Sequence, residues 1–209
     1  RKILGTYSVN GKNNMNILIP MAGRGGRFIE AGYKLPKPLI NINGKTMIEK
    51  VVENISFNAN DNFIFLIQKD HIDDFNIAYT LNKICPGCKI ITLNGLTEGA
   101  ACTCLLAEKY INNNEELLIA NCDQIMEWDK RTFTHLKNKP NDGIIFLFKS
   151  QDTNNSYVEI VNGKIVRTVE KQVISTDATC GVYFWKQGKE FVKSAKKMME
   201  KVRPEVWDI

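Results

Sequence analysis

The residues between positions 22 and 38 have the types and spacing needed to bind phosphate groups. Three glycines let backbone N–H groups approach an anion closely, and nearby basic side chains can neutralise its charge. Lys37 stands between two prolines of fixed φ, so its position on the backbone is restricted. The residues concerned are Gly23, Gly25 and Gly26, with Arg24, Arg27 and Lys37. The stretch therefore predicts a phosphate-binding loop.

Two well-known glycine loops do not describe this stretch. The dinucleotide fingerprint G-x-G-x-x-G would begin at Gly23 and Gly25, but its third glycine position is Phe28. The run at residues 44–46 ends like a P-loop, yet that motif would need glycine at Leu39. An ordinary flexible turn remains the structural alternative for the glycine cluster.

Further polar residues follow the ends of two later apolar runs. Asp123 comes shortly after the run at 117–120, where a carboxylate could hold Mg²⁺ on a triphosphate. Small residues in the stretch 97–100, Gly99 and Ala100, leave the backbone open to close approach by a ligand. A helix or turn cap is the alternative for Asp123, and a plain helix N-terminus is the alternative for 97–100.

The elements that must position these residues alternate between strand and helix in the first part of the chain. Short apolar runs predict buried strands, and apolar residues at helical spacing predict amphipathic helices. The expected strands are 16–21, 39–42, 62–68, 89–93 and 116–120, and the expected helices are 47–55, 70–84 and 99–110, the last with Ala101, Leu105 and Leu106 inward. This order predicts right-handed βαβ units and a mostly parallel sheet with a ligand at the carboxyl ends of its strands.

The second part of the chain predicts antiparallel additions to that sheet. A hairpin is expected to turn at Asn162-Gly163, because this dipeptide favours the tight turn of paired strands. The expected elements are helix 129–137, strand 143–149, hairpin strands 157–161 and 164–170, strand 179–185 and helix 189–202. The predicted fold class is α/β, a Rossmann-like mixed sheet flanked by helices.

Length and composition narrow the class of protein. A chain of 209 residues with 44% hydrophobic and 24% charged residues predicts one globular domain, here 15–209, after a leader or added extension at 1–14. The net charge of +5 is too modest and scattered to indicate nucleic acid as a partner. No apolar run reaches the ~20 residues of a membrane span, and no secretory signal is visible, so we expect a cytoplasmic protein.

Cys85 and Cys88 lack a second C-x-x-C pair, so a turn with incidental thiols is preferred to a zinc or redox site.

The glycine stretch also resembles a family signature. The A-G-x-G-x-R pattern at 22–27, followed by P-K-P-L at 36–39, resembles that of the nucleotidyltransferases that activate sugar phosphates and related metabolites. The resemblance implies their GT-A-like fold and a reaction that releases pyrophosphate from a nucleoside triphosphate. It assigns Arg27 to the β- and γ-phosphates, Lys37 to the α-phosphate, and Asp123 to Mg²⁺. The nucleotide-binding residues that it implies are Met21, Ala22, Gly23, Arg24, Gly25, Gly26, Glu98, Gly99 and Ala100.

The resemblance extends to residues for the acceptor and a second metal ligand. Glu170-Lys171 resembles the E-K element that reaches the acceptor phosphate, although Gln172 replaces the usual proline. The strand 179–184 resembles the family's T-G-x-Y-x strand, which assigns Gly181 and Tyr183 to the acceptor pocket. Asp208 lies in a tryptophan-containing segment, and in the family a segment of this kind ahead of a G-T pair often brings a second metal-binding aspartate. The alternatives are a solvated strand end for Glu170 and Lys171 and a frayed terminus for Asp208.

The substrates follow from resemblance alone. The sub-pattern I-P-M-A-G at 19–23, with E-A-G-Y-K at 30–34 and I-A-N-C-D-Q at 119–124, resembles capsule-associated cytidylyltransferases, in particular those that use CTP and phosphoglutamine in phosphoramidate synthesis. A sugar-1-phosphate or phosphocholine nucleotidyltransferase and a non-catalytic nucleotide-binding module remain alternatives. A glycosyltransferase is disfavoured because residues 123–125 lack the second acid of a D-x-D motif. The sequence does not fix the oligomeric state, and a homodimer is one state that it permits.

Overall fold

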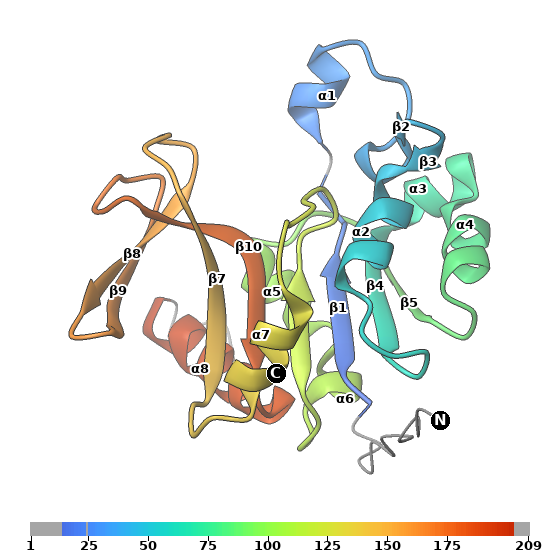
Figure 1. Ribbon diagram of the computed structural model, residues 1–209. Coiled ribbons are helices and arrows are strands. Elements are labelled where there is room, and N and C mark those ends of the chain that lie inside the picture. Colours follow the sequence, from blue (N-terminus) through green and yellow to red (C-terminus); the bar gives the residue numbers. More distant parts are fainter. Residues whose placement is uncertain (1–13, 24, 203–209) are drawn as a thin grey trace, which may run out of the picture.

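The structure, a computed structural model, describes residues 14–23 and 25–202 and contains an eight-stranded mixed sheet. The parallel half has the order β5-β4-β1-β6, and its strands are β1 (Asn16–Pro20), β4 (Asn62–Gln68), β5 (Lys89–Leu93) and β6 (Leu117–Ala120). Three neighbouring parallel pairs confirm the predicted βαβ organisation of the first half (Figure 1).

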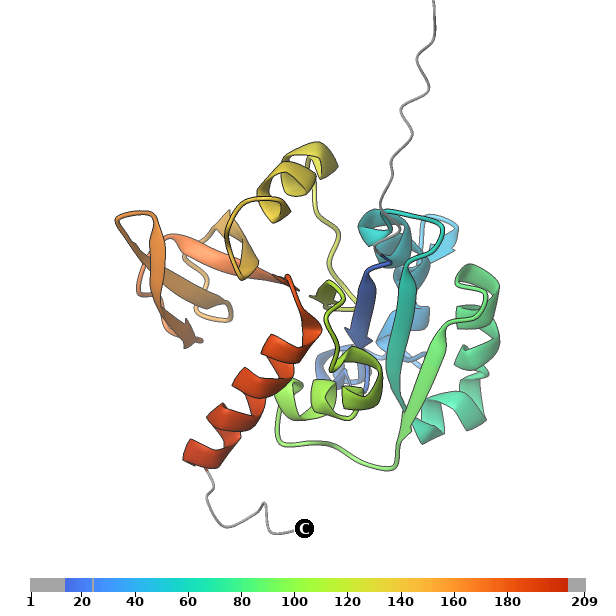
Figure 2. The same cartoon turned by 90° about the horizontal axis from the view of Figure 1, so that it is seen from below.

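Strand β1 is buried on both faces because helices cover both sides of the sheet. Ile17 and Ile19 pack into one hydrophobic cluster, and Leu18 packs into the other. The first cluster contains side chains of α2 (Met47–Ile55), α4 (Ile77–Ile84) and α7 (Lys130–Lys137). The second contains side chains of α5 (Ala100–Leu105), α6 (Glu108–Ile111) and α8 (Gly188–Val202). Figure 2 shows α2 and α7 on one side of the sheet and α5, α6 and α8 on the other.

The antiparallel half is built around β10 (Asp177–Trp185). This strand pairs with β6, with β7 (Gly143–Lys149) and with β8 (Ser156–Val161), which in turn pairs with β9 (Lys164–Glu170). The β8–β9 hairpin turns at Asn162 and Gly163, whose φ values are 51° and 74°, as the two-residue turn requires. Figure 1 shows this hairpin far from β1. The predicted antiparallel additions are confirmed.

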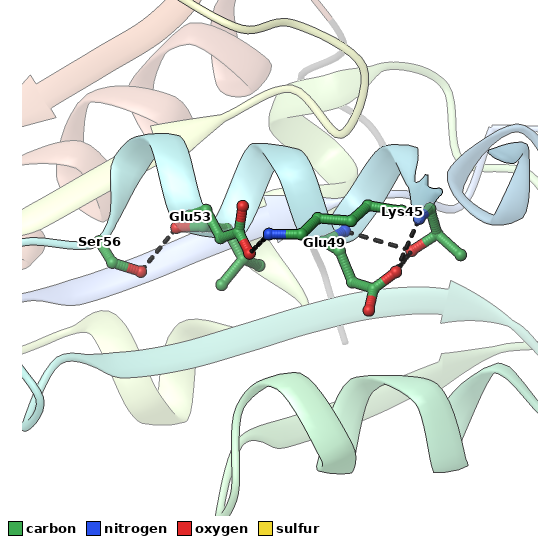
Figure 3. Close-up of polar contacts among 6 residues, drawn as sticks. Lys45, Glu49, Glu53 and Ser56 are labelled. Atoms are coloured by element: carbon green, nitrogen blue, oxygen red, sulfur yellow. Dashed lines mark hydrogen bonds and ion pairs between the residues drawn. The ribbon is translucent and has the colours of Figure 1, made fainter. Parts of the chain in front are cut away.

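The start of α2 carries a capping box. The Thr46 hydroxyl accepts a hydrogen bond from the Glu49 amide at 3.3 Å, and the Thr46 amide donates to the Glu49 carboxylate at 2.6 Å. These interactions with Thr46 hold the pKa of the Glu49 carboxyl below its usual range. Lys45, which precedes the helix, forms an ion pair with Glu53 of α2 (Figure 3). The cap fixes where α2 begins, at Met47, nine residues beyond the end of the predicted phosphate-binding stretch at 22–38.

Two predicted helices are each broken in the structure. The predicted helix 70–84 is divided into α3 (Lys69–Phe75) and α4 because Asn76 adopts the left-handed conformation, with φ of 49°. The predicted helix 99–110 is divided into α5 and α6. Leu106, predicted to face inward, is 49% exposed at this interruption. Both predictions were therefore wrong about continuity, although the chain segments are helical.

The phosphate-binding stretch contains short elements that sequence patterns did not indicate. Residues 26–30 form the short helix α1 (Gly26–Glu30), and Lys37–Leu39 form a 3₁₀ turn. The expected strand 39–42 is reduced to β2 (Asn41–Ile42), which pairs with β3 (Lys45–Thr46). Apart from Asn14, the predicted leader 1–14 lies outside the described residues.

Two smaller expectations concern cysteines and membranes. Cys85 and Cys88 are free thiols at the ends of a turn, where the Cys88 amide donates to the Cys85 carbonyl at 3.1 Å. Within the described part of the chain, no helix combines the length and apolar character needed to cross a membrane.

Candidate nucleotide and phosphate site

The structure brings together two predicted site residues that are far apart in sequence. Lys37 begins the 3₁₀ turn after the glycine stretch, and Asp123 follows β6 by three residues. The Lys37 Nζ and the Asp123 carboxylate form an ion pair, with side chains 26% and 25% exposed. A cation and an anion therefore share a partly enclosed position at the carboxyl edge of the parallel strands. Either could exchange its partner for a charged ligand.

The glycine stretch packs against Lys37. Gly25 has a φ of 63°, and a Cβ placed there would lie 3.6 Å from the Lys37 Cβ. The Lys37 Nζ lies 4.8 Å from the centroid of the Phe28 ring, within range of a cation–π contact. Phe28 thus occupies the position that excluded the dinucleotide fingerprint and instead contacts the lysine.

A cavity of about 280 Å³ lies between the loop after β1 and the loop after β5. It is lined by residues from both loops and from the end of β6: Pro20, Ala22, Gly23, Leu96, Thr97, Gly99, Ala100, Thr103 and Asn121. Four predicted nucleotide-binding residues, Ala22, Gly23, Gly99 and Ala100, therefore line one space. Small residues leave it open to a ligand.

The other predicted nucleotide-binding residues that the structure describes are not among those that line this cavity. Met21 is 2% exposed and packs in the core, while its amide extends the β1–β4 ladder through a 2.9 Å bond to Leu66. Glu98 lies between two residues that line the cavity. Gly26 starts α1, and the backbone of Arg27 lies in the same helix. Arg24 and the Arg27 side chain lie outside what the structure describes.

Gln68 is a positioning residue that the sequence reasoning missed. It ends β4 with only 2% exposure, and its Nε2 donates to the Ala22 carbonyl at 2.8 Å and to the Gly95 carbonyl at 3.0 Å. One side chain therefore ties together the two loops that form the cavity. A polar residue at the end of an otherwise apolar strand was the available signal.

The Gln68→Leu substitution is expected to lower the free energy of unfolding by about 1–3 kcal/mol, because the two carbonyls would lose their buried donor. The KM for the nucleoside triphosphate should rise as the two loops separate. Denaturant unfolding and initial rates measure both effects. The exposed Gln151→Leu is the matched control. Equal behaviour of the two variants would contradict the positioning role.

Gly181 brings the predicted acceptor strand against the Asp123 loop. Its φ is 72°, and the β7–β10 register shifts between Thr179 and Tyr183. A Cβ at Gly181 would lie 2.1 Å from Asn121 Nδ2 and 2.6 Å from the Gln124 side-chain oxygen. The backbone N–H of Asn121 also donates a hydrogen bond to the Gly181 carbonyl at 3.0 Å. The left-handed backbone conformation favours glycine here, and an added Cβ would have to displace the side chains of Asn121 and Gln124.

The Gly181→Ala substitution is expected to lower the free energy of unfolding by about 2–4 kcal/mol and to reduce activity. The left-handed backbone accounts for part of this loss, and displacement of Asn121 and Gln124 accounts for the rest. Gly163→Ala is a matched control, because Gly163 has a φ of 74° with no atom within 4 Å of the added Cβ. Denaturant unfolding of both variants isolates the steric contribution. Equal losses would show that Asn121 and Gln124 yield without cost.

The other predicted acceptor residues are Tyr183, Glu170 and Lys171, and their described side-chain contacts are with residues other than Lys37 and Asp123. The Tyr183 hydroxyl lies 3.1 Å from the Thr179 hydroxyl within β10. Lys171 has a φ of 54°, and its ammonium forms a 3.2 Å ion pair with Glu170, both being exposed. Among the described residues, the hydrogen bonds and ion pairs of Glu170 and Lys171 do not reach the Lys37–Asp123 pair.

The donor set for a metal ion rests on Asp123. In the described residues, no group of three or more His, Cys, Asp or Glu side chains could hold an ion. Mg²⁺ is commonly bound by one or two carboxylates together with substrate phosphates, so a single carboxylate fits this ion. Burial raises the pKa of the neighbouring Cys122 thiol to about 12, so this residue stays a neutral thiol. Asp208 lies outside the described residues.

Of two further cavities, one adjoins Asp123 and the other lies away from the predicted site residues. One of about 520 Å³ begins at Asp123 and continues along residues 124–128 to β7. A larger one of about 790 Å³ lies at the amino ends of β1 and β4, beside the Cys85 to Cys88 turn. The larger cavity contains none of the predicted site residues and lies at the edge opposite Asp123.

A curated protein from an archaeon is similar to part of this sequence. The Bifunctional protein GlmU of Methanocaldococcus jannaschii is 27% identical in an alignment of 157 residues that covers 70% of this chain and 35% of that relative. The match thus spans little more than a third of the relative's length.

Two solved structures share the fold. The nucleoside-diphosphate-sugar pyrophosphorylase from Vibrio cholerae RC9 superposes with a TM-score of 0.73 at 22% identity, over 92% of this chain and 82% of that one. The inositol-1-phosphate CTP transferase from T. maritima gives 0.70 at 14% identity, over 86% and 73% of the two chains. These likenesses show a mixed α/β fold of the nucleotidyltransferase type. A family model of the nucleotidyl transferases matches residues 17–209, and the chain therefore belongs to that family.

Proposed function

We propose that the protein transfers CMP from CTP to a phosphorylated small metabolite and releases pyrophosphate. The observation that carries this proposal is the Lys37–Asp123 pair beside a cavity lined by glycine and alanine residues of two loops. The cavity suits a nucleotide, and the pair supplies one charge for the phosphates and one for their counter-ion.

In the proposed reaction, an oxygen of the acceptor phosphate attacks the α-phosphorus of CTP. The new P–O bond forms as the bond to the β-phosphate oxygen breaks, and pyrophosphate leaves with that electron pair. Such a reaction needs alignment and charge neutralisation more than a covalent catalyst. Lys37 is assigned to the α-phosphate, where charge develops. Arg27 is assigned to the β- and γ-phosphates.

Asp123 is the proposed ligand for Mg²⁺, which would neutralise the triphosphate. In the structure, Asp123 holds Lys37. Binding of the nucleotide would therefore give both residues new partners, with Lys37 turning to phosphate and Asp123 to the ion. The Phe28 ring and the backbone of Gly25 would keep Lys37 near the phosphates during this exchange.

The acceptor proposed first is phosphoglutamine, in the synthesis of a capsular phosphoramidate, and it is supported by the sequence patterns at 19–23, 30–34 and 119–124. A sugar 1-phosphate is the second candidate, favoured by the similarity to GlmU and by the fold shared with a sugar pyrophosphorylase. Either acceptor would enter next to Asp123, where the cavity of about 520 Å³ begins.

Release of pyrophosphate from CTP in the presence of Mg²⁺ tests this function. Phosphoglutamine, phosphocholine and glucose 1-phosphate are compared as acceptors, and UTP, ATP and GTP then replace CTP. We expect release that depends on an acceptor and on CTP. If the protein binds nucleotide but releases pyrophosphate with none of the nucleotide and acceptor pairs, a non-catalytic binding module would be favoured.

A further inference from the structure

The cavity that begins at Asp123 has an aromatic and acidic lining. Its volume is about 520 Å³, and the side chains that give it its chemistry are Asp123, Glu127, Trp128, Phe146, Phe148 and Cys180. The three aromatic residues come from the loop after β6 and from β7. Among the described lining residues there is no lysine, arginine or histidine. The charged groups that line the cavity are therefore both carboxylates.

The polar groups of the aromatic and thiol wall already have partners. The Trp128 indole N–H donates to the Asn54 carbonyl at 3.3 Å, and the Cys180 thiol donates to the Met126 sulfur at 3.3 Å. A sugar ring would need several hydrogen-bonding partners from this wall. The wall offers mainly ring faces and apolar surface, with Glu127 as an exposed carboxylate and the Gln124 side chain as one further polar group.

Aromatic faces together with a carboxylate favour a cationic ligand, because the ring quadrupole attracts positive charge. One ring of this cavity already contacts an ammonium in the folded protein. The Lys130 Nζ lies 6.0 Å from the centroid of Trp128 and 5.4 Å from that of Phe57. Lys130 is not among the residues that line the cavity, so its ammonium leaves the space beside Phe146 and Phe148 open.

We propose that the acceptor carries an ammonium group, which binds between Glu127 and the rings of Trp128, Phe146 and Phe148 while its phosphate lies toward Asp123. This inference rests on the proposed function and specifies its substrate class. Phosphocholine and phosphorylated amino acids carry such a group, and sugar phosphates without an amino group, such as glucose 1-phosphate, do not. The cavity would thus select acceptors by charge at the end remote from the phosphate.

The test compares acceptors that carry an ammonium group with analogues that lack this positive charge. Phosphocholine is paired with 3,3-dimethylbutyl phosphate, in which carbon replaces nitrogen, and phosphoglutamine is paired with its N-acetyl derivative. For the cationic acceptor that reacts, we expect kcat/KM to exceed that of its neutral analogue by about tenfold or more. A ratio below about threefold, or turnover of glucose 1-phosphate alone, would overturn the inference and leave the proposed transferase function intact.

Variants locate the effect in the cavity. Glu127→Gln and Phe148→Leu should each reduce the preference for the cationic acceptor by about threefold or more, with the KM for CTP unchanged. Phe148 is 42% exposed, so its replacement should leave the fold intact. Glu159→Gln, an exposed change in β8 away from the cavity, is the control. An unchanged preference in both cavity variants would contradict the assignment.

Direct binding separates this inference from the catalytic proposal. If no acceptor reacts with any nucleotide, the transferase proposal fails, and calorimetry with choline alone then tests the cation site. Choline binding that is weakened by Glu127→Gln and retained by Glu159→Gln would support the site. Absence of choline binding to the full chain under those conditions would overturn it.

Discussion

The Lys37→Ala variant should turn over at least about a hundredfold more slowly than the wild-type protein, a rise in the barrier of about 2.7 kcal/mol or more. The reason is that Lys37 is assigned to the α-phosphate, where negative charge grows in the transition state. Its fixed position, between two prolines and against Gly25 and Phe28, makes this charge available without rearrangement of the loop.

The fold should tolerate this change. Both members of the Lys37–Asp123 pair are about a quarter exposed, so losing the pair should cost at most about 1 kcal/mol of stability. Pyrophosphate release at saturating substrates gives kcat, and thermal unfolding checks the fold. Lys34→Ala, an exposed lysine of the same loop, is the control. Retention of more than about a tenth of the wild-type rate would contradict the role of Lys37.

The strands of the parallel half could be predicted from sequence because each contains a short apolar run, including the edge strand β5, which is only partly buried. The run at 62–68 coincides with β4, and the run at 89–93 with β5. The helix at 70–84 was predicted as continuous because apolar periodicity passes through Asn76 without a proline or glycine. Asn76 nevertheless takes the left-handed conformation, which a helical pattern does not reveal.

The candidate site was only partly predictable. Lys37 and Asp123 could be named because they follow recognisable motifs, and the structure adds that they are in contact. The role of Gln68 depends on which carbonyls lie beside the end of β4, and these come from loops 46 and 27 residues away in the chain. Likewise, the ring centroids of Phe146 and Trp128 lie 5.2 Å apart in an arrangement that depends on the pairing of β7 with β10. Such contacts between distant segments have no local sequence signal.

The Asp123→Asn variant is expected to lose activity by about a hundredfold to ten-thousandfold, because an amide keeps the shape of the carboxylate but not its charge. The expected signature is a higher Mg²⁺ concentration for half-maximal activity, measured by titrating pyrophosphate release. Asp74→Asn, an exposed change in α3, is the control and should leave the titration unchanged. An unaltered Mg²⁺ dependence in Asp123→Asn would remove Asp123 from the metal site.

The double variant Lys37→Ala with Asp123→Asn tests whether the two residues act as one unit. Since they form an ion pair before nucleotide binds, each single change leaves the other group without its charged partner. We therefore expect the double variant to be slower than the slower single variant by less than about tenfold. Losses that multiply fully would instead mean that Lys37 and Asp123 contribute independently, and that the ion pair between them has no part in preparing the site.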